Sequence, residues 1–226
     1  MKIKNNSAMF IITSVVCLLP IILSFAVYNE LPGQIAVRWD SAGNPDNFLP
    51  KALAAFGLPF LFMAVNIFSK LFLFNDPKRS ANLPKVMLII SVWTPPVLSL
   101  VLVPLTLFIA MGAKIPIPMI APVLVGIIFI LCGNYMPKTR QNYTVGIKFP
   151  WTLHNADNWN KTHRIAGYLW VISGIILIAV GFIVGDASLW GVPLILYIIA
   201  VLLVVPLLYS YLLYNKIRKD KKEADD

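Results

Sequence analysis

Six long stretches without a charged residue are the feature that most constrains how this chain folds. They are Asn5–Asn29, Ala52–Ser69, Val86–Ala113, Ile115–Pro137, Ile165–Gly185 and Ala187–Asn215. A helix needs roughly 20 apolar residues to cross the hydrocarbon core of a bilayer. The second stretch is the shortest, but Leu71–Phe74 extends it past Lys70, whose ammonium group we expect to snorkel to the interface. The sequence therefore predicts an all-α membrane protein, a bundle of six transmembrane helices.

Composition supports the same fold class. Hydrophobic residues make up 58% of the 226 residues and charged residues 13%, whereas soluble domains average roughly 45–50% and about 25%. A water-soluble fold of this size would expose large apolar patches. The two cysteines, Cys17 and Cys132, both lie in apolar stretches, so no disulfide framework is expected.

The distribution of Lys and Arg predicts the orientation. With six spans and a cytoplasmic N-terminus, sixteen of the 19 Lys and Arg residues fall inside, and only Arg38, Lys51 and Lys114 fall outside. Lys and Arg near span ends prefer the cytoplasm, so we expect both termini to be cytoplasmic. The net charge of +9 then reflects orientation and attraction to anionic lipid, with no direct nucleic-acid binding. Cleavage near Ser24–Ala26, as in a signal peptide, would leave the remaining topology unchanged.

The first of two informative loops is a short structured outside loop, residues 29–51, within a predicted two-span region 1–85. Ile35, Val37 and Trp39 alternate with polar or small residues, which predicts a short strand, and 40–46 reads as a turn. One interpretation is a site for an extracellular ligand, and the other is an interfacial Trp and a capped turn on the bilayer surface. The residues assigned to the ligand are Arg38, Trp39, Asp40, Gly43, Asp46 and Lys51.

The second is a longer cytoplasmic loop, Tyr135–Arg164, within a predicted four-span region 86–226. It mixes basic and aromatic residues, which predicts a structured polar cap under the bundle or a partner surface. The residues assigned to it are Asn134, Lys138, Arg140, Asn142, Gly146, Trp151, Trp159, Thr162, His163 and Arg164. A membrane enzyme using His154, Asp157 and His163 is the alternative, but these residues form no metal or nucleophile motif. We therefore expect no catalytic residue, metal or cofactor.

Prolines are frequent within the spans, at Pro20, Pro59, Pro95, Pro96, Pro104, Pro122, Pro193 and Pro206. Each frees a backbone carbonyl, and two readings follow. One is a broken-helix site in a small transporter or exporter of peptide or lipid. The other is ordinary kinking, with neighbouring helices satisfying the freed carbonyls. No span carries an ionisable residue at mid-depth, which argues against a proton-coupled pump, and Asn66 is expected to bond between helices.

Two segments carry a resemblance to a known family. The first is "LPGQIAVRWDSAGNPDNFLPK" at Leu31–Lys51, and the second is "GNYMPKTRQNYTVGIKFPWTLHNADNWNKTHRIAG" at Gly133–Gly167. Both resemble the loop signatures of the SdpI family, bacterial immunity proteins against the sporulation-delaying-protein toxin. Arg38 stands before Trp39, where family members often have His.

The resemblance implies a function that composition does not. It implies a multi-pass protein of the bacterial cell membrane that protects against a secreted, membrane-active toxin peptide met on the outside. It also implies that the toxin-bound protein holds a cytoplasmic repressor protein at the membrane. The expected partners are therefore the toxin peptide, the repressor and the lipid bilayer.

Overall fold

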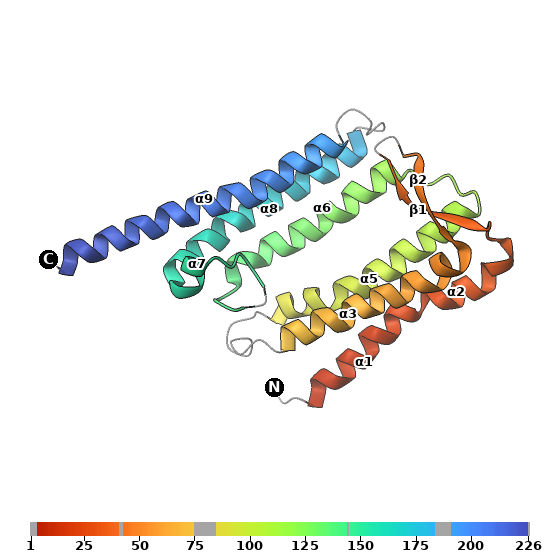
Figure 1. Cartoon of the computed structure of the whole chain (residues 1–226), viewed down its shortest axis with the longest axis horizontal. Coiled ribbons are helices and arrows are strands. Elements are labelled where there is room, and N and C mark those ends of the chain that lie inside the picture. The colour runs from red at the N-terminus through yellow and green to blue at the C-terminus, as the bar shows by residue number, and fades with distance from the viewer. Residues whose placement is uncertain (1–3, 41–42, 75–84, 144, 184–190, 226) are drawn as a thin grey trace. The chain divides into compact units, whose positions relative to one another are not determined.

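The computed structural model describes residues 4–40, 43–74, 85–143, 145–183 and 191–225. The helices are α1 (Lys4–Leu18), α2 (Pro20–Val27), α3 (Leu58–Phe74), α5 (Lys85–Ala110), α6 (Ile117–Tyr135), α7 (Pro150–His154), α8 (Ala156–Ile183) and α9 (Gly191–Asp225), and the strands are β1 (Gln34–Trp39) and β2 (Pro45–Pro50) (Figure 1). Short helical turns cover Tyr28–Glu30, Leu53–Gly57 and Met136–Lys138. The chain forms two compact units. The first contains α1, α2, α3, the two strands and α5 from Ile89, and the second contains α6 from Met119, α7, α8 and α9.

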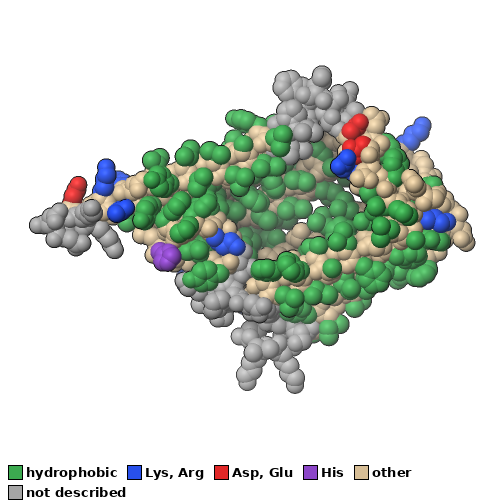
Figure 2. All heavy atoms as spheres, viewed as in Figure 1, with side chains coloured by type: hydrophobic (Ala, Val, Ile, Leu, Met, Phe, Trp, Pro, Cys, Tyr) green, Lys and Arg blue, Asp and Glu red, His purple; other side chains and the backbone are tan. Residues whose placement is uncertain are grey.

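Six helices that are long and apolar enough to span a membrane are confirmed within the part of the chain that the structure describes. The spans are Ala8–Glu30, Leu53–Leu73, Lys85–Ala110, Ile117–Lys138, Ala156–Ile183 and Leu196–Asp220. Hydrophobic side chains cover the visible flanks of these helices (Figure 2), as expected of surfaces that face lipid. Lys2 and the turn at 75–84 lie outside the described residues. The predicted division at residue 85 stays a prediction.

The start of the fifth span differs from the prediction. We expected the loop to reach Arg164, but α8 already begins at Ala156. The Asn155 side chain caps it, since its Oδ1 accepts the Asn158 N–H at 2.9 Å. Asp157 and Lys161 form an ion pair at 2.8 Å one turn apart. Capping and ion pairing extend this helix through a polar segment that hydropathy alone reads as loop.

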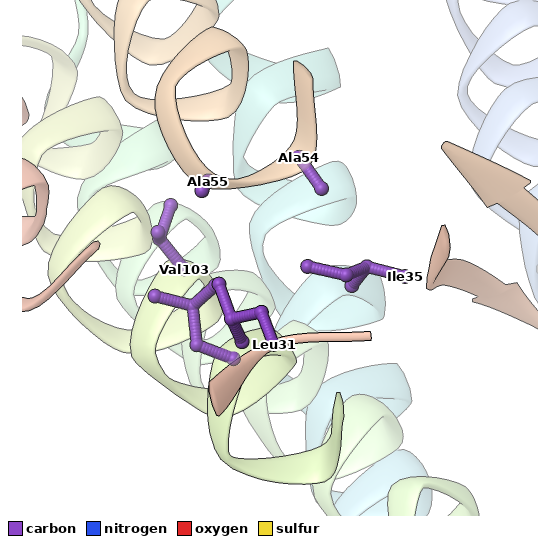
Figure 3. Close-up of a cluster of buried hydrophobic side chains, with 6 residues drawn as sticks. Leu31, Ile35, Ala54, Ala55 and Val103 are labelled. Atoms are coloured by element: carbon purple, nitrogen blue, oxygen red, sulfur yellow. The ribbon is translucent and has the colours of Figure 1, made fainter. Parts of the chain in front are cut away.

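A β-hairpin occupies the first loop, and β1 covers the predicted strand. The predicted turn at 40–46 includes residues 41–42, which lie outside the described residues. β1 and β2 pair antiparallel, with Ile35 opposite Leu49 and a register irregularity after Ala36. The sequence did not predict β2. Ile35 and Leu31 pack with Ala54 and Ala55 of the helical turn Leu53–Gly57 and with Val103 and Leu107 of α5, and this buried cluster joins the hairpin to both elements (Figure 3).

Two carbonyls freed by prolines are satisfied by side chains of neighbouring helices in the first unit. Pro96 cannot donate to Val92 O, which instead accepts the Asn66 side-chain amide at 2.9 Å. Pro59 likewise cannot donate to Ala55 O, and this carbonyl accepts the Ser24 hydroxyl at 2.7 Å. Interhelical bonding by Asn66 is thus confirmed, and at both prolines a side chain of a neighbouring helix supplies a donor to the freed carbonyl.

The expectation that Lys70 snorkels to the interface is wrong. Its side chain is fully buried, and its ammonium donates to Phe10 O at 2.8 Å, to the Thr13 hydroxyl and to the Ser14 hydroxyl at 3.3 Å. It also lies 4.7 Å from the centre of the Phe10 ring. Three acceptors match the three N–H donors of an ammonium group, so bonding to α1 replaces the contact with water that snorkelling would provide.

Close approach of α6 and α8 organises the second unit. A Cβ atom built on Gly126 would lie 2.6 Å from Gly174 O, and one on Gly133 would lie 2.8 Å from Gly167 O. Glycine permits this approach because it leaves no side chain between the backbones. Leu177 of α8 packs with Ile198 and Leu202 of α9.

Candidate functional site

The hairpin is held by polar contacts among residues that the sequence assigned to a ligand. The Arg38 Nε donates to Asp46 Oδ1 at 2.8 Å, and this bond raises the pKa of the Arg38 guanidinium above its ordinary value. Asp40 Oδ1 accepts the Asn44 N–H at 2.8 Å and so closes the turn. Gly43 has φ of +84°, a conformation that glycine adopts without strain. Arg38, Asp40 and Asp46 therefore shape the hairpin.

A pocket of about 700 Å³ lies beside this hairpin, and we call it the hairpin pocket. Its walls come from both strands, from the end of α5 and from the segment that follows α5. It is lined by Pro32, Gln34, Ile35, Ala36, Trp39, Gly43, Pro45, Phe48, Ile109, Ala110, Ala113, Lys114, Ile115, Pro116 and Ile117. Apolar and aromatic side chains dominate, and Lys114 is the one charged residue among these.

The structure therefore divides the predicted outside residues. It brings Trp39 and Gly43 to the hairpin pocket, and it places Lys51 away from that lining, with its ammonium 4.5 Å from the centre of the Tyr28 ring. The sequence reasoning missed Phe48 and Lys114. The isolated Lys114 between two apolar spans was the available signal, but nothing in the sequence pairs it with the hairpin.

The second loop folds into a cap around Trp159, which is fully buried. Its indole N–H donates to Thr139 O at 2.6 Å, and its ring stacks on that of His163 with centres 3.9 Å apart. A Cβ atom built on Gly146 would collide with His163 Nε2, and φ of Gly146 is +116°. Glycine is thus required there by both the backbone conformation and the ring beside it.

His163 is held as a neutral imidazole by its hydrogen bonds. Nε2 accepts the Ile147 N–H at 3.0 Å, and Nδ1 lies 2.8 Å from Trp159 O. A nitrogen that accepts a hydrogen bond carries no proton, so Nδ1–H is the donor to Trp159 O. The ring is fully buried. Its role in this arrangement is to join the loop to α8.

Trp151 and Asn158 attach the cap to α9. The Trp151 indole N–H donates to Ser210 Oγ at 2.9 Å, and the Asn158 amide donates to Ser210 O at 2.8 Å. The Trp151 ring also lies near Tyr211 and Tyr214. α7, α8 and α9 therefore meet at one serine.

The remaining predicted residues of this loop separate into buried and exposed groups. Thr162 donates to Asn158 Oδ1 at 3.1 Å, and Asn142 Oδ1 accepts the Val145 N–H at 2.6 Å, so both are internal. Asn134 is exposed on α6. Lys138, Arg140 and Arg164 are exposed and line a second pocket.

The three residues of the alternative enzyme hypothesis, His154, Asp157 and His163, each make a separate local contact. Asp157 pairs with Lys161, His163 bonds within the cap, and His154 Nδ1 contacts Pro150 O. Across the described ranges, no three His, Cys, Asp or Glu side chains gather as a metal-binding group.

Two segments of the chain match models of known protein families, and nearly the whole chain matches a curated relative. Residues 138–210 match the model of the SdpI/YfhL protein family, and residues 15–63 match that of a domain of unknown function, DUF1648. The chain is 26% identical over 207 residues to "Immunity protein SdpI" of Bacillus subtilis (strain 168), covering 92% of this chain and 96% of that protein. No solved structure matches.

Fold and loops define a multi-pass α-helical membrane protein with a hairpin in its first loop and a tryptophan-centred cap in its second. The matched residues 15–63 contain the hairpin, and 138–210 run from the start of the cap to the serine that anchors it. The chain is similar to the SdpI/YfhL protein family over residues 138–210 and to an SdpI immunity protein over nearly its whole length.

Proposed function

We propose that this protein is an immunity protein that receives an apolar segment of a secreted, membrane-active toxin peptide in the hairpin pocket. The observation that carries the proposal is the pocket itself, which is mostly apolar and is lined by Trp39 and Phe48. Binding sites for small or extended ligands are typically concave, apolar and a few hundred cubic ångströms in volume. A relative of nearly the same length bears the name of an immunity protein.

The chemistry of the pocket favours a hydrophobic peptide with a local negative or polar group. Trp39 is half-buried and Phe48 is 47% exposed, so each can bury further aromatic surface against a ligand. Lys114 supplies a single cation at the edge of an otherwise uncharged lining. Sequestering the apolar segment of the peptide would keep that segment from inserting into the bilayer.

The test is survival of a toxin-sensitive bacterium that expresses the protein and is challenged with purified SDP-type peptide. Trp39→Ala and Ala113→Trp are the test variants, since the first removes an aromatic wall and the second fills the pocket. Losing the burial of one aromatic side chain should weaken peptide binding roughly 10- to 100-fold. Both variants should insert normally and protect less.

The matched control is Ala200→Trp, because Ala200 is an exposed helical alanine in α9 and is not among the residues that line the hairpin pocket. It should protect as the unmodified protein does. Full protection by both test variants at normal membrane levels would overturn the assignment of the pocket. Death of cells that carry the unmodified, correctly inserted protein would overturn the immunity function.

A second part of the proposal is that toxin binding is reported to a cytoplasmic repressor held by the second-loop cap. Such signalling requires the toxin to favour one arrangement of the protein over another. Affinity purification of the tagged protein from cells grown with and without the peptide tests it. A DNA-binding protein recovered only with the peptide supports sensing, and equal recovery or none contradicts it.

A further inference from the structure

A basic pocket of about 570 Å³ lies on the surface of the second unit. It is lined by Pro137, Lys138, Thr139, Arg140, Gln141, Ala156, Asn160 and Arg164. Three of these side chains are cationic, three are polar and none is acidic. The toxin-binding proposal does not use this pocket.

Local structure brings the basic residues together. Ala156, Asn160 and Arg164 are four residues apart on α8 and so share one face of that helix. The opposite wall is the chain that leaves α6, from Pro137 to Gln141. Lys138 and Arg140 lie on that wall.

The wall opposite α8 is fixed before any ligand arrives. Thr139 O accepts the buried Trp159 indole at 2.6 Å. The Gln141 side-chain amide donates to Thr152 O at 2.8 Å. These bonds anchor the backbone on both sides of Arg140, which reduces the ordering cost of binding.

The positive charge of this pocket is not neutralised within the described chain. The two ion pairs found there are Arg38–Asp46 and Lys161–Asp157, so Asp157, beside Ala156, is already paired. The Lys138 ammonium lies 4.7 Å from the centre of the Tyr135 ring, a contact that leaves its charge in place. Three neighbouring cations repel one another, and an anion bound among them relieves that repulsion.

We propose that this pocket binds the phosphate of an anionic phospholipid. Guanidinium groups match phosphate oxygens with paired hydrogen bonds, and Arg140 and Arg164 provide two of them. The pocket adjoins the ends of two spans, since one runs to Lys138 and the other begins at Ala156. Basic pockets at such span ends suit lipid headgroups.

The surface that continues from Arg164 favours a lipid over a free phosphate ion. Tyr168, Ile172 and Ile175 follow on the same side of α8 at helical spacing and are 64%, 54% and 55% exposed. An acyl chain can lie along this stripe while its phosphate occupies the pocket. An inorganic phosphate ion would use the cations and leave the stripe uncovered.

The test is lipid binding to the purified, delipidated protein in detergent, followed by native mass spectrometry and thermal stability. The probes are phosphatidylglycerol, phosphatidylcholine and inorganic phosphate. We expect saturable binding of phosphatidylglycerol that weakens about 10- to 100-fold in the double variant Arg140→Gln/Arg164→Gln, since charged hydrogen bonds are lost. Phosphatidylcholine and inorganic phosphate should bind far more weakly than phosphatidylglycerol.

The matched control is Lys216→Gln/Arg218→Gln, which removes the same charge from exposed residues of α9. It should keep the affinity for phosphatidylglycerol within about twofold, because surface charges outside the pocket contribute little. Arg164→Lys, which keeps the charge, should bind better than Arg164→Gln and so separates lost binding from misfolding.

Three results would overturn the proposal. They are equal losses in the two double variants, inorganic phosphate binding as tightly as phosphatidylglycerol, and no preference between the two lipids. Each is independent of toxin survival, so this site and the hairpin pocket can fail separately.

Discussion

Asn66 illustrates at the residue scale how this chain accommodates proline inside its spans. Its side-chain amide donates to Val92 O, the carbonyl that Pro96 leaves without a backbone donor. Its Oδ1 lies 3.4 Å from both the Thr13 and the Ser14 hydroxyl. A polar residue between apolar helices would be costly if its groups were unpaired. Here it joins α1, α3 and α5, and it shares Thr13 and Ser14 with the buried Lys70.

A double-mutant cycle tests this pairing. Asn66→Leu should destabilise the protein by about 1–2 kcal/mol, because Val92 O loses its donor in a water-free environment. Pro96→Ala restores a backbone N–H that can bond Val92 O. In that background Asn66→Leu should cost about half as much or less.

The measurement is reversible unfolding of the purified protein in mixed micelles. Pro104→Ala is the control background, since that proline lies in the same helix but leaves a different carbonyl. Equal costs of Asn66→Leu in the Pro96→Ala and Pro104→Ala backgrounds would show that the amide does not serve Val92.

At the element scale, glycines seven residues apart pair α6 with α8. Gly126 meets Gly174 and Gly133 meets Gly167, while Gly181 lies against Met119 O. As the residue number on α6 increases by seven, the residue number of its partner on α8 decreases by seven, so the two helices are antiparallel. A repeat of seven residues keeps one seam of each helix facing the other. The spacing is visible in the sequence, but the choice of partner helix is not.

Adding a methyl group to this seam should separate the helices. Gly174→Ala places a Cβ atom 2.6 Å from Gly126 O, and overpacking of this kind costs about 1–3 kcal/mol. The readout is the midpoint of thermal unfolding in detergent. Gly33→Ala is the control, because its Cβ would meet nothing within 4 Å; similar shifts in the two variants would contradict close packing at Gly174.

Element boundaries show where sequence reasoning succeeded and where it did not. The apolar stretches located all six spans, because a lipid-facing helix needs only length and apolar side chains. They missed the first turns of α8, where Asn155 and the Asp157–Lys161 pair stabilise a polar helix. They also missed β2. The segment Pro45–Pro50 shows no clear alternation of apolar and polar residues, and its pairing with β1 appears only in the structure.

At the scale of the whole molecule, the asymmetry of Lys and Arg predicts which loops face outside. The first loop, containing the hairpin, carries two of the 19 basic residues, and the C-terminal segment from Lys216 carries five. This asymmetry predicts that the hairpin pocket meets secreted ligands, while the C-terminus stays in the cytoplasm.

Cysteine accessibility checks that orientation. In a background without Cys17 and Cys132, Asn47→Cys and Lys219→Cys both introduce an exposed thiol. A membrane-impermeant maleimide added to intact cells should label the Asn47→Cys thiol and leave the Lys219→Cys thiol unlabelled until the cells are lysed. The reverse pattern would show that the orientation is inverted.

The sequence alone determined the class of this protein, its number of spans and the two loops that carry its family resemblance. Those features follow from local composition, because each spanning helix satisfies its own backbone and needs only lipid around it. The tertiary structure decided which residues act together. It buried Lys70 against α1, assigned Arg38 and Asp46 to each other, and left Trp39 beside Lys114 and Arg140 beside Arg164. Apart from Arg38 and Asp46, which are eight residues apart in one hairpin, these groupings join residues of different elements. Side-chain packing and hydrogen bonding across elements determine them, so neither hydropathy nor spacing could reveal them.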